Sequence, residues 1–267
     1  MDEAALEPPG WYGKLPSLGD FASRRLSPDF IEAWDGWLAA GIAEWRAREP
    51  QAWLPAYLSC PSWRFVLMPG VVPGSAPDAL YAGVLLPSVD RVGRYFPLTV
   101  VWPLPALPHD GASLNRLLQR LHQIDDLAVD ALQDDWSIEQ LEAGLAQLAA
   151  ASAGDADQGN AAAPAAGPAQ LPVAPLPLPD ALSARECEPA GELAASFACW
   201  AAQALGQQWQ ACALWLSDPG TGRRRLRVTQ GLPVGREFAQ LLGAPADEVG
   251  GVGGASSGAD AGVIDWD

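Results

Sequence analysis

The sequence predicts an α+β fold in which antiparallel strands and helices pack around one core. Three runs rich in β-forming residues follow one another, Ser62 to Met68, Leu80 to Leu86 and Tyr95 to Trp102, with Gly, Pro and Asp between them. Long stretches on both sides of these runs place apolar residues at helical spacing. Strands and helices do not alternate as β-α-β units, so we expect an antiparallel sheet and not a doubly wound parallel one.

The N-terminal elements come in a clear order. Gly10 to Leu15 predicts a short strand, and Ser27-Pro28 predicts a helix start, with Ser as the N-cap and Pro at the first helical position. The helix that follows carries a wide apolar face. Its members are Phe30, Trp34, Trp37, Leu38, Gly41, Ile42 and Trp45.

The later elements alternate between helices and a hairpin. Leucines from Leu114 to Leu132 predict a second long helix, and Ser137 is the expected cap of a third. A further helix is predicted over Leu193 to Leu205. Two strands, Ala211 to Leu216 and Arg225 to Thr229, are expected to form a hairpin, followed by a short helix with Phe238, Leu241 and Leu242.

Composition divides the chain into five parts. Residues 1–9 are expected to be disordered, and residues 10–151 to form the main α/β domain. Residues 152–179 are rich in Ala, Pro and Gly and are typical of a linker. Residues 180–242 either complete the domain or form a small lobe, and we favour completion because about 60 residues make only a marginal core. Residues 243–267 are acidic and Gly-rich and are expected to be a disordered tail, which either has no contact role or serves as a short docking peptide.

Composition also limits the function classes. The 267 residues are 49% hydrophobic, which predicts a folded core, and no apolar run approaches the roughly 20 residues of a membrane helix. Met1 to Gly10 lacks the basic start and apolar stretch of a secretory signal, so we expect a cytoplasmic protein. A net charge of −16 argues against nucleic acid and anionic membranes as partners. The four cysteines, Cys60, Cys187, Cys199 and Cys212, form no C-x-x-C pair and are expected to be thiols.

No catalytic constellation is evident. The chain has only His109 and His122, and it lacks a G-x-S-x-G elbow and a phosphate-binding glycine loop. Asp126, Asp130 and Asp134 are spaced i, i+4, i+8 and could hold a divalent ion, but a solvated helix face is the favoured interpretation. We therefore predict no catalytic residue, no metal site and no cofactor.

One basic cluster leaves two interpretations. It comprises Arg223, Arg224, Arg225 and Arg227 on the expected hairpin. A contact with a phosphate or an acidic protein is one interpretation. The favoured one is a charged edge strand that blocks unwanted strand pairing.

Two stretches mix strand residues with Gly, Pro and paired charges. The first is residues 10–21, GWYGKLPSLGDF, and the second is residues 83–98, GVLLPSVDRVGRYFPL. Asp90 is expected to pair with Arg91 and Arg94 and thereby fix the turn between two strands. These stretches are either rigid structural corners or a preorganised polar surface, and the residues alone leave both open.

Together with the segments AWDGW at 33–37 and PSWRF at 61–65, these two stretches resemble the TagF family of type VI secretion-associated proteins. The family pattern has a Gly-Lys-Leu-Pro…Gly-Asp-Phe opening, a Trp-Asp-x-Trp helix, a Trp-Arg-Phe strand and a Pro-Ser-Val-Asp-x-Val-Gly-Arg-x-Phe-Pro-Leu turn. All four occur here in order. The resemblance is dense over residues 10–103, weaker over 213–242, and absent from the linker and the tail.

The resemblance implies a cytoplasmic accessory protein that represses assembly or activity of the secretion apparatus after translation. It implies a longin- or profilin-like fold, a central antiparallel sheet flanked by helices. It also implies a partner, the forkhead-associated-domain scaffold of the same system, and no established catalytic residues. The charged residues that match the motif positions are our candidate protein-binding surface: Lys14, Asp20, Arg64, Asp90, Arg91 and Arg94.

Two other classes of function remain open at this point. One is a metal-dependent enzyme that acts on phosphoryl groups through Asp20, Asp90 or the Asp126 stripe. The other is a structural component of the secretion apparatus.

Overall fold

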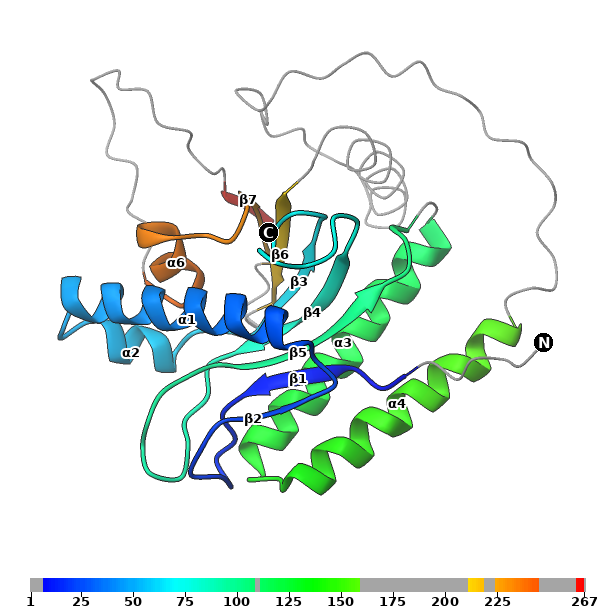
Figure 1. Ribbon diagram of the computed structural model, residues 1–267, viewed down its shortest axis with the longest axis horizontal. Helices are drawn as coiled ribbons and strands as arrows, with labels where there is room; N and C mark the ends of the chain where they lie inside the picture. Colours follow the sequence, from blue (N-terminus) through cyan, green and yellow to red (C-terminus); the bar gives the residue numbers. More distant parts are fainter. Residues whose placement is uncertain (1–6, 109–110, 159–210, 219–223, 245–262, 267) are drawn as a thin grey trace, which may run out of the picture.

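A single antiparallel sheet forms the centre of the molecule (Figure 1). The computed structural model describes residues 7–108, 111–158, 211–218, 224–244 and 263–266. In these residues the strand order is β2-β1-β5-β4-β3-β6-β7-β8, and every neighbouring pair is antiparallel. The strands are β1 (Gly10–Gly13), β2 (Ala22–Arg24), β3 (Trp63–Leu67), β4 (Leu80–Leu86), β5 (Leu98–Leu104), β6 (Cys212–Ser217), β7 (Arg224–Gln230) and β8 (Val263–Trp266).

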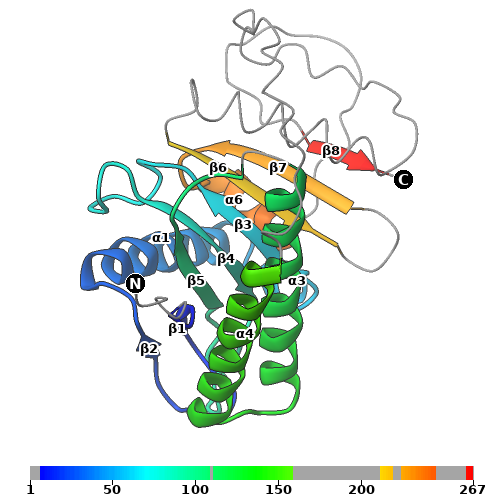
Figure 2. The same cartoon turned by 90° about the vertical axis from the view of Figure 1, so that its right-hand side faces the viewer.

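Helices cover both faces of this sheet. Figures 1 and 2 show α1 (Pro28–Arg48), α2 (Trp53–Leu58) and α6 (Gly235–Leu241) on one face, and α3 (Gly111–Gln133) and α4 (Ile138–Gln158) on the other. Side chains of β3 show the division, because successive residues of a strand point to opposite faces. Phe65 packs against Trp34 of α1, with ring centroids 5.4 Å apart, whereas Arg64 faces Asp125 of α3. The predicted sheet flanked by helices is confirmed.

The helix α1 begins where the sequence predicts. Ser27 has an extended backbone, and its hydroxyl accepts a hydrogen bond from the Phe30 N–H at 3.3 Å, which satisfies one of the free amides of the first turn. The apolar face of α1 then enters the core, where the fully buried Trp34 donates to Thr99 Oγ1 at 2.9 Å. Satisfying the indole N–H allows this large side chain to be buried completely.

The helix α4 is also capped as predicted. The Ser137 N–H donates to Gln140 Oε1 at 2.8 Å and the Gln140 N–H donates to Ser137 Oγ at 3.3 Å, a reciprocal capping box. The helix continues to Gln158, so the linker predicted from residue 152 starts too early. The reason is that Ala, Asp and Gln continue a helix well, while their low hydrophobicity resembles a linker. Residues 159–179 of that linker lie outside the described residues.

The C-terminal portion completes the sheet. β6 pairs with β3 from Ala213 to Leu216, and β7 extends the sheet by pairing with β6. The Trp37 indole of α1 donates to the Pro233 carbonyl at 2.7 Å, and Phe238 of α6 lies edge-on to Trp37. These contacts favour one composite domain over a separate small lobe, the two arrangements that the sequence left open. The helix predicted over residues 193–205 lies outside the described residues.

Four local features differ from the sequence prediction. β5 begins at Leu98 and not at Tyr95, because residues 90–95 close a turn. β2 and α2 were not predicted, since elements of three and six residues are too short to show a period. β8 lies in the predicted tail and pairs with β7, so β7 is not the edge strand that its arginines suggested.

Candidate protein-binding surface

Two loops that are distant in the sequence meet at the β1 end of the sheet. Residues 14–21 connect β1 to β2, and residues 87–97 connect β4 to β5. We call them the two motif loops, because they contain the two Gly- and Pro-rich stretches of the sequence. β1 lies beside β5, so the sheet itself brings the loops together.

A buried ion pair joins the two motif loops. Lys14 Nζ lies 2.5 Å from Asp90 Oδ2, and both residues are only 3% exposed. The same carboxylate oxygen accepts from Arg94 Nε at 2.7 Å. The other oxygen, Oδ1, accepts the backbone N–H groups of Val92 at 3.0 Å and Arg94 at 2.8 Å. Asp90 therefore organises its own turn and also anchors the neighbouring loop.

The surroundings of Asp90 keep it ionised. Burial by itself raises the pKa of this carboxyl group, but hydrogen bonds from Lys14, Arg94 and Val92 stabilise the charged form and together hold its pKa well below the ordinary value. A buried charge is tolerated only where it is paired and hydrogen-bonded, as it is here.

Backbone contacts fix the remaining geometry of the loops. The Arg91 N–H donates to the Leu18 carbonyl at 2.9 Å, and Arg94 Nη2 donates to the Gly19 carbonyl. The Ser88 hydroxyl donates to the Lys14 carbonyl at 2.8 Å. Gly93 has φ +83°, a left-handed conformation that closes the turn and favours glycine. The loops are thus a preorganised unit on a rigid sheet.

Phe21 covers the buried ion pair. Its ring centroid lies 4.5 Å from Lys14 Nζ, a cation–π contact, and the ring stacks on Tyr12 and meets Phe96 edge-on at 4.8 Å. The side chain is nevertheless 41% exposed. Tyr12 in turn donates its hydroxyl to Asp35 of α1, and burial followed by this contact raises the pKa of the phenol.

The outer surface of the motif loops mixes charge and apolar area. Asp20, Arg91 and Arg94 are exposed, and Val92 between the two arginines is 64% exposed. Together with Phe21 they present a patch with two cationic groups, one carboxylate and two exposed apolar side chains. Mixed patches on a rigid scaffold are suited to binding another protein.

The six residues predicted as one surface have three different placements. Asp20, Arg91 and Arg94 lie together on the outside of the motif loops. Lys14 and Asp90 are buried beneath them, so they support the surface and do not lie on it. The sixth residue, Arg64 of β3, lies on the α3 face of the sheet, where its Nε is 3.6 Å from Asp125 Oδ2.

Sequence reasoning missed the apolar half of this patch. The predicted surface consisted of charged residues alone and did not include Phe21 or Val92. The available signal was an apolar residue between two arginines in a turn that contains Gly93. Such a residue has no route to the core and is expected to be exposed.

The described residues contain no group of three or more His, Cys, Asp or Glu that could hold a metal ion. Asp126 and Asp130 are exposed on α3 and Asp134 is exposed in the turn just after it, in agreement with a solvated face. His109 lies outside the described residues. Of the cysteines, Cys60 and Cys212 are buried free thiols, while Cys187 and Cys199 also lie outside. The enzyme alternative therefore gains no metal site within the described part of the chain.

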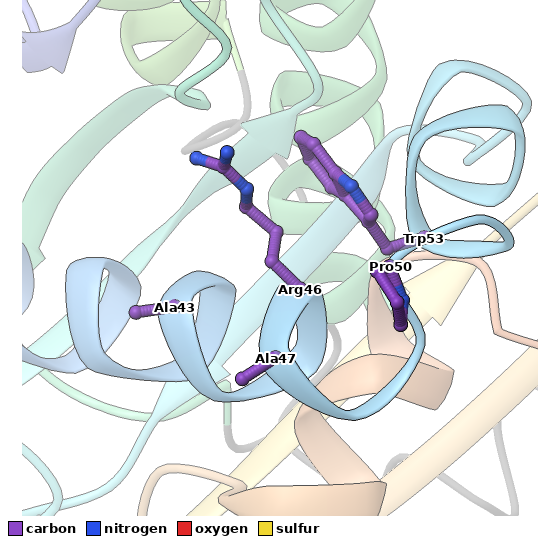
Figure 3. A pocket seen from close by; sticks show the side chains of 5 residues that line it. All are labelled: Ala43, Arg46, Ala47, Pro50 and Trp53. Carbon is purple, nitrogen blue, oxygen red and sulfur yellow. The ribbon is translucent and has the colours of Figure 1, made fainter.

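A shallow hollow lies over the end of α1 (Figure 3). It has a volume of about 400 Å³, and the Arg46 guanidinium lies 4.9 Å from the Trp53 ring centre at its wall. Its other lining residues are Ala43, Ala47 and Pro50. This lining offers no carboxylate, imidazole, thiol or hydroxyl group for chemistry.

Within the described ranges, no helix is both long and apolar enough to cross a bilayer.

Comparison with known proteins gives a consistent result. A family model described as TagF N-terminal domain, type VI secretion system-associated, matches residues 10–148. The fold is similar to a crystal structure of PA0076 from Pseudomonas aeruginosa PAO1, with a TM-score of 0.59 and 30% sequence identity over 93% of this chain and 100% of that chain. A search of curated proteins gave no match. The matched family region includes both motif loops.

Proposed function

The chain belongs to the TagF family of type VI secretion system-associated proteins, and on that premise we propose that it is a binding protein that represses the secretion apparatus after translation. Its proposed partner is the forkhead-associated-domain scaffold of the same system, and its proposed site of action is the cytoplasm. It acts by occupying a partner and does not transform a substrate.

The observation that carries this proposal is the construction of the motif loops. Buried Lys14 and Asp90, together with the exposed Arg94, form a network whose effect is to hold two distant loops in one conformation. A buried ion pair is weak support for stability alone, because desolvation offsets much of its attraction. The network instead fixes the shape of the exposed patch above it, and preorganisation of this kind reduces the entropy lost on binding.

The composition of the patch suggests how the partner is held. Arg91 and Arg94 supply cationic groups that suit carboxylates, and Val92 and Phe21 supply apolar anchors. The two arginines lie on a chain with a net charge of −16, so they offer an acidic partner a local cationic site on an otherwise acidic protein.

The decisive experiment compares two charge reversals. The test variant is Arg91→Glu combined with Val92→Ser, which alters the patch and leaves the network of Lys14, Asp90 and Arg94 intact. The matched control is Arg116→Glu, an equal charge reversal at an exposed position of α3. Charge reversal at Asp90 itself is unsuitable, because Asp90 is buried and its loss would disturb the fold.

Each variant is used as tagged bait in the native cytosol, and secretion of an apparatus-dependent effector is measured in parallel. We expect the native chain and the control to recover the scaffold and to repress secretion. The test variant, with an unchanged thermal transition, should recover at least tenfold less scaffold and should lose repression. Equal recovery and repression by a folded test variant would place binding elsewhere, and failure of the native chain to recover any secretion component would contradict the binding proposal.

The same cells can be used to test the alternative that the chain is a structural component of the apparatus. A repressor is absent from the assembled, firing apparatus, whereas a structural component remains bound to it. Purification of the assembled apparatus followed by detection of the chain decides between them.

A further inference from the structure

The opposite end of the sheet carries a short strand that comes from the very end of the sequence. β8, Val263–Trp266, pairs antiparallel with β7 (Figure 2), with Leu226 opposite Ile264 and Arg225 opposite Asp265. Residues 245–262 separate it from the end of the α6 region along the chain. In the sheet order β7 lies five positions and β8 six positions from β1, which leads into the motif loops.

The two strands have complementary composition. β7 has the sequence RRLRVTQ and contains three arginines, whereas residues 263–267 have the sequence VIDWD and contain two aspartates and no basic residue. The backbone register places Asp265 opposite Arg225, so an acidic position is paired with a cationic position. The side chain of Arg225 is exposed.

β7 is also a rigid platform for a strand to pair with. Its other edge is hydrogen-bonded to β6 over six residue pairs. The buried Arg227 donates to Gln240 Oε1 at 3.0 Å and to the Glu237 carbonyl at 3.4 Å, which ties the strand to α6. Strand addition to a fixed edge obtains affinity from main-chain hydrogen bonds and specificity from the side chains at alternate positions.

We propose that the β8-facing edge of β7 is a docking site for an extended acidic segment of a partner protein, and that the chain's own Val263–Trp266 occupies this site as an intramolecular competitor. The resident strand defines the chemistry of the ligand: two apolar residues, an acidic residue opposite Arg225, and an aromatic residue. β8 pairs with four residues of β7, Arg224 to Arg227. This site is independent of the patch on the motif loops, and either proposal can fail without the other.

The test uses the full-length chain and a fluorescent peptide with the sequence of residues 262–267, GVIDWD. The opening variant replaces both Ile264 and Asp265 by Pro. Ladder N–H groups alternate between the two edges of a strand, so one of two adjacent prolines must remove an N–H that faces β7. The matched control places the same two prolines at Ser256 and Ser257, outside β8.

We expect the peptide to bind the opening variant at least tenfold more tightly than it binds the native chain or the control, measured by fluorescence anisotropy. Adding Arg225→Glu to the opening variant should weaken this binding at least tenfold, and a peptide with both aspartates replaced by lysine should not bind. Hydrogen exchange of the β7 peptide should rise in the opening variant and return to the native level when the peptide is added.

Three results would overturn the proposal. Equal peptide affinity for the native chain and the opening variant would show that β8 does not compete for the site. Peptide binding that is unaffected by Arg225→Glu would place the peptide elsewhere. A native dimer in sedimentation analysis that dissociates in the opening variant would assign the edge to a second copy of this chain and not to a partner protein.

Discussion

The contact between Gly41 of α1 and Phe238 of α6 tests whether the C-terminal portion is part of the main core. Phe238 is fully buried, and its ring lies edge-on to Trp37 with centroids 5.5 Å apart. A Cβ atom built on Gly41 would lie 2.6 Å from three ring carbons of Phe238. The two helices therefore approach so closely that only glycine fits at this position while the phenyl ring is present.

The expected energies follow from this geometry. Phe238→Ala removes a buried aromatic ring and should lower the free energy of unfolding by about 3–5 kcal/mol. Gly41→Ala overpacks the contact at about 1–3 kcal/mol. It also gains about 1 kcal/mol of helix propensity, which offsets part of that loss. In the Phe238→Ala background the clash is absent and only the gain remains, so the coupling between the two changes should be about 1–3 kcal/mol.

Urea unfolding followed by tryptophan fluorescence measures these four proteins directly. The matched control is Gly36→Ala on the same helix, where an added Cβ meets no atom within 4 Å. It should stabilise both backgrounds equally. A Gly41→Ala effect that is the same with and without Phe238 would refute the contact. A separate early transition in Phe238→Ala, with the remaining transition unchanged, would show an independent C-terminal lobe.

Four further predictions test local features of the structure. The stability that ionised Asp90 contributes is fully present above its unfolded pKa of about 3.9 and is lost as the pH falls below that value, because its folded pKa is lower. Between pH 7 and pH 3 the urea midpoint should therefore fall less steeply in Asp90→Asn than in the native chain. Equal pH dependence of the two midpoints would contradict the network. Burial raises the pKa of the Cys60 thiol to about 12, so iodoacetamide at pH 8 should label this thiol only after unfolding. Peptide mass spectrometry measures the labelling, and rapid labelling of the native chain would contradict the burial of Cys60. Ser27→Ala removes the α1 cap and should destabilise the chain by about 1 kcal/mol in urea, whereas Ser27→Gly should cost less. Glu142→Gln weakens the contacts that tie α4 to Trp11 of β1 and to Arg25, which follows β2. A loss of about 1–2 kcal/mol in the free energy of unfolding is expected, and no loss would show that solvent replaces these contacts.

The candidate site was only partly accessible to sequence reasoning. The Asp90–Arg94 pair was predictable because the two residues are four positions apart in a turn that contains Gly93. The pairing of Lys14 with Asp90 was not, since it depends on β1 lying beside β5. Treating Lys14 and Asp90 as surface residues failed for the same reason, because charged residues are usually exposed and only their mutual contact allows burial.

Much of the fold is determined locally. The caps at Ser27 and Ser137, the apolar faces of α1 and α3, and the strands β3, β4 and β6 follow from short-range patterns, since hydrogen bonding and burial within one element select residues at fixed spacing. The class of fold and the family motifs are likewise read from neighbouring residues.

Only the tertiary structure decides which of these elements become neighbours. It places β6 against β3 across more than 140 residues and pairs β8 with β7. It also buries Lys14 under Phe21 while leaving Val92 exposed. These outcomes depend on contacts between residues far apart in sequence, where the gain from burying a shared apolar surface must exceed the entropy of closing a long loop. No local pattern encodes that balance, and the binding surfaces proposed for this protein depend on it.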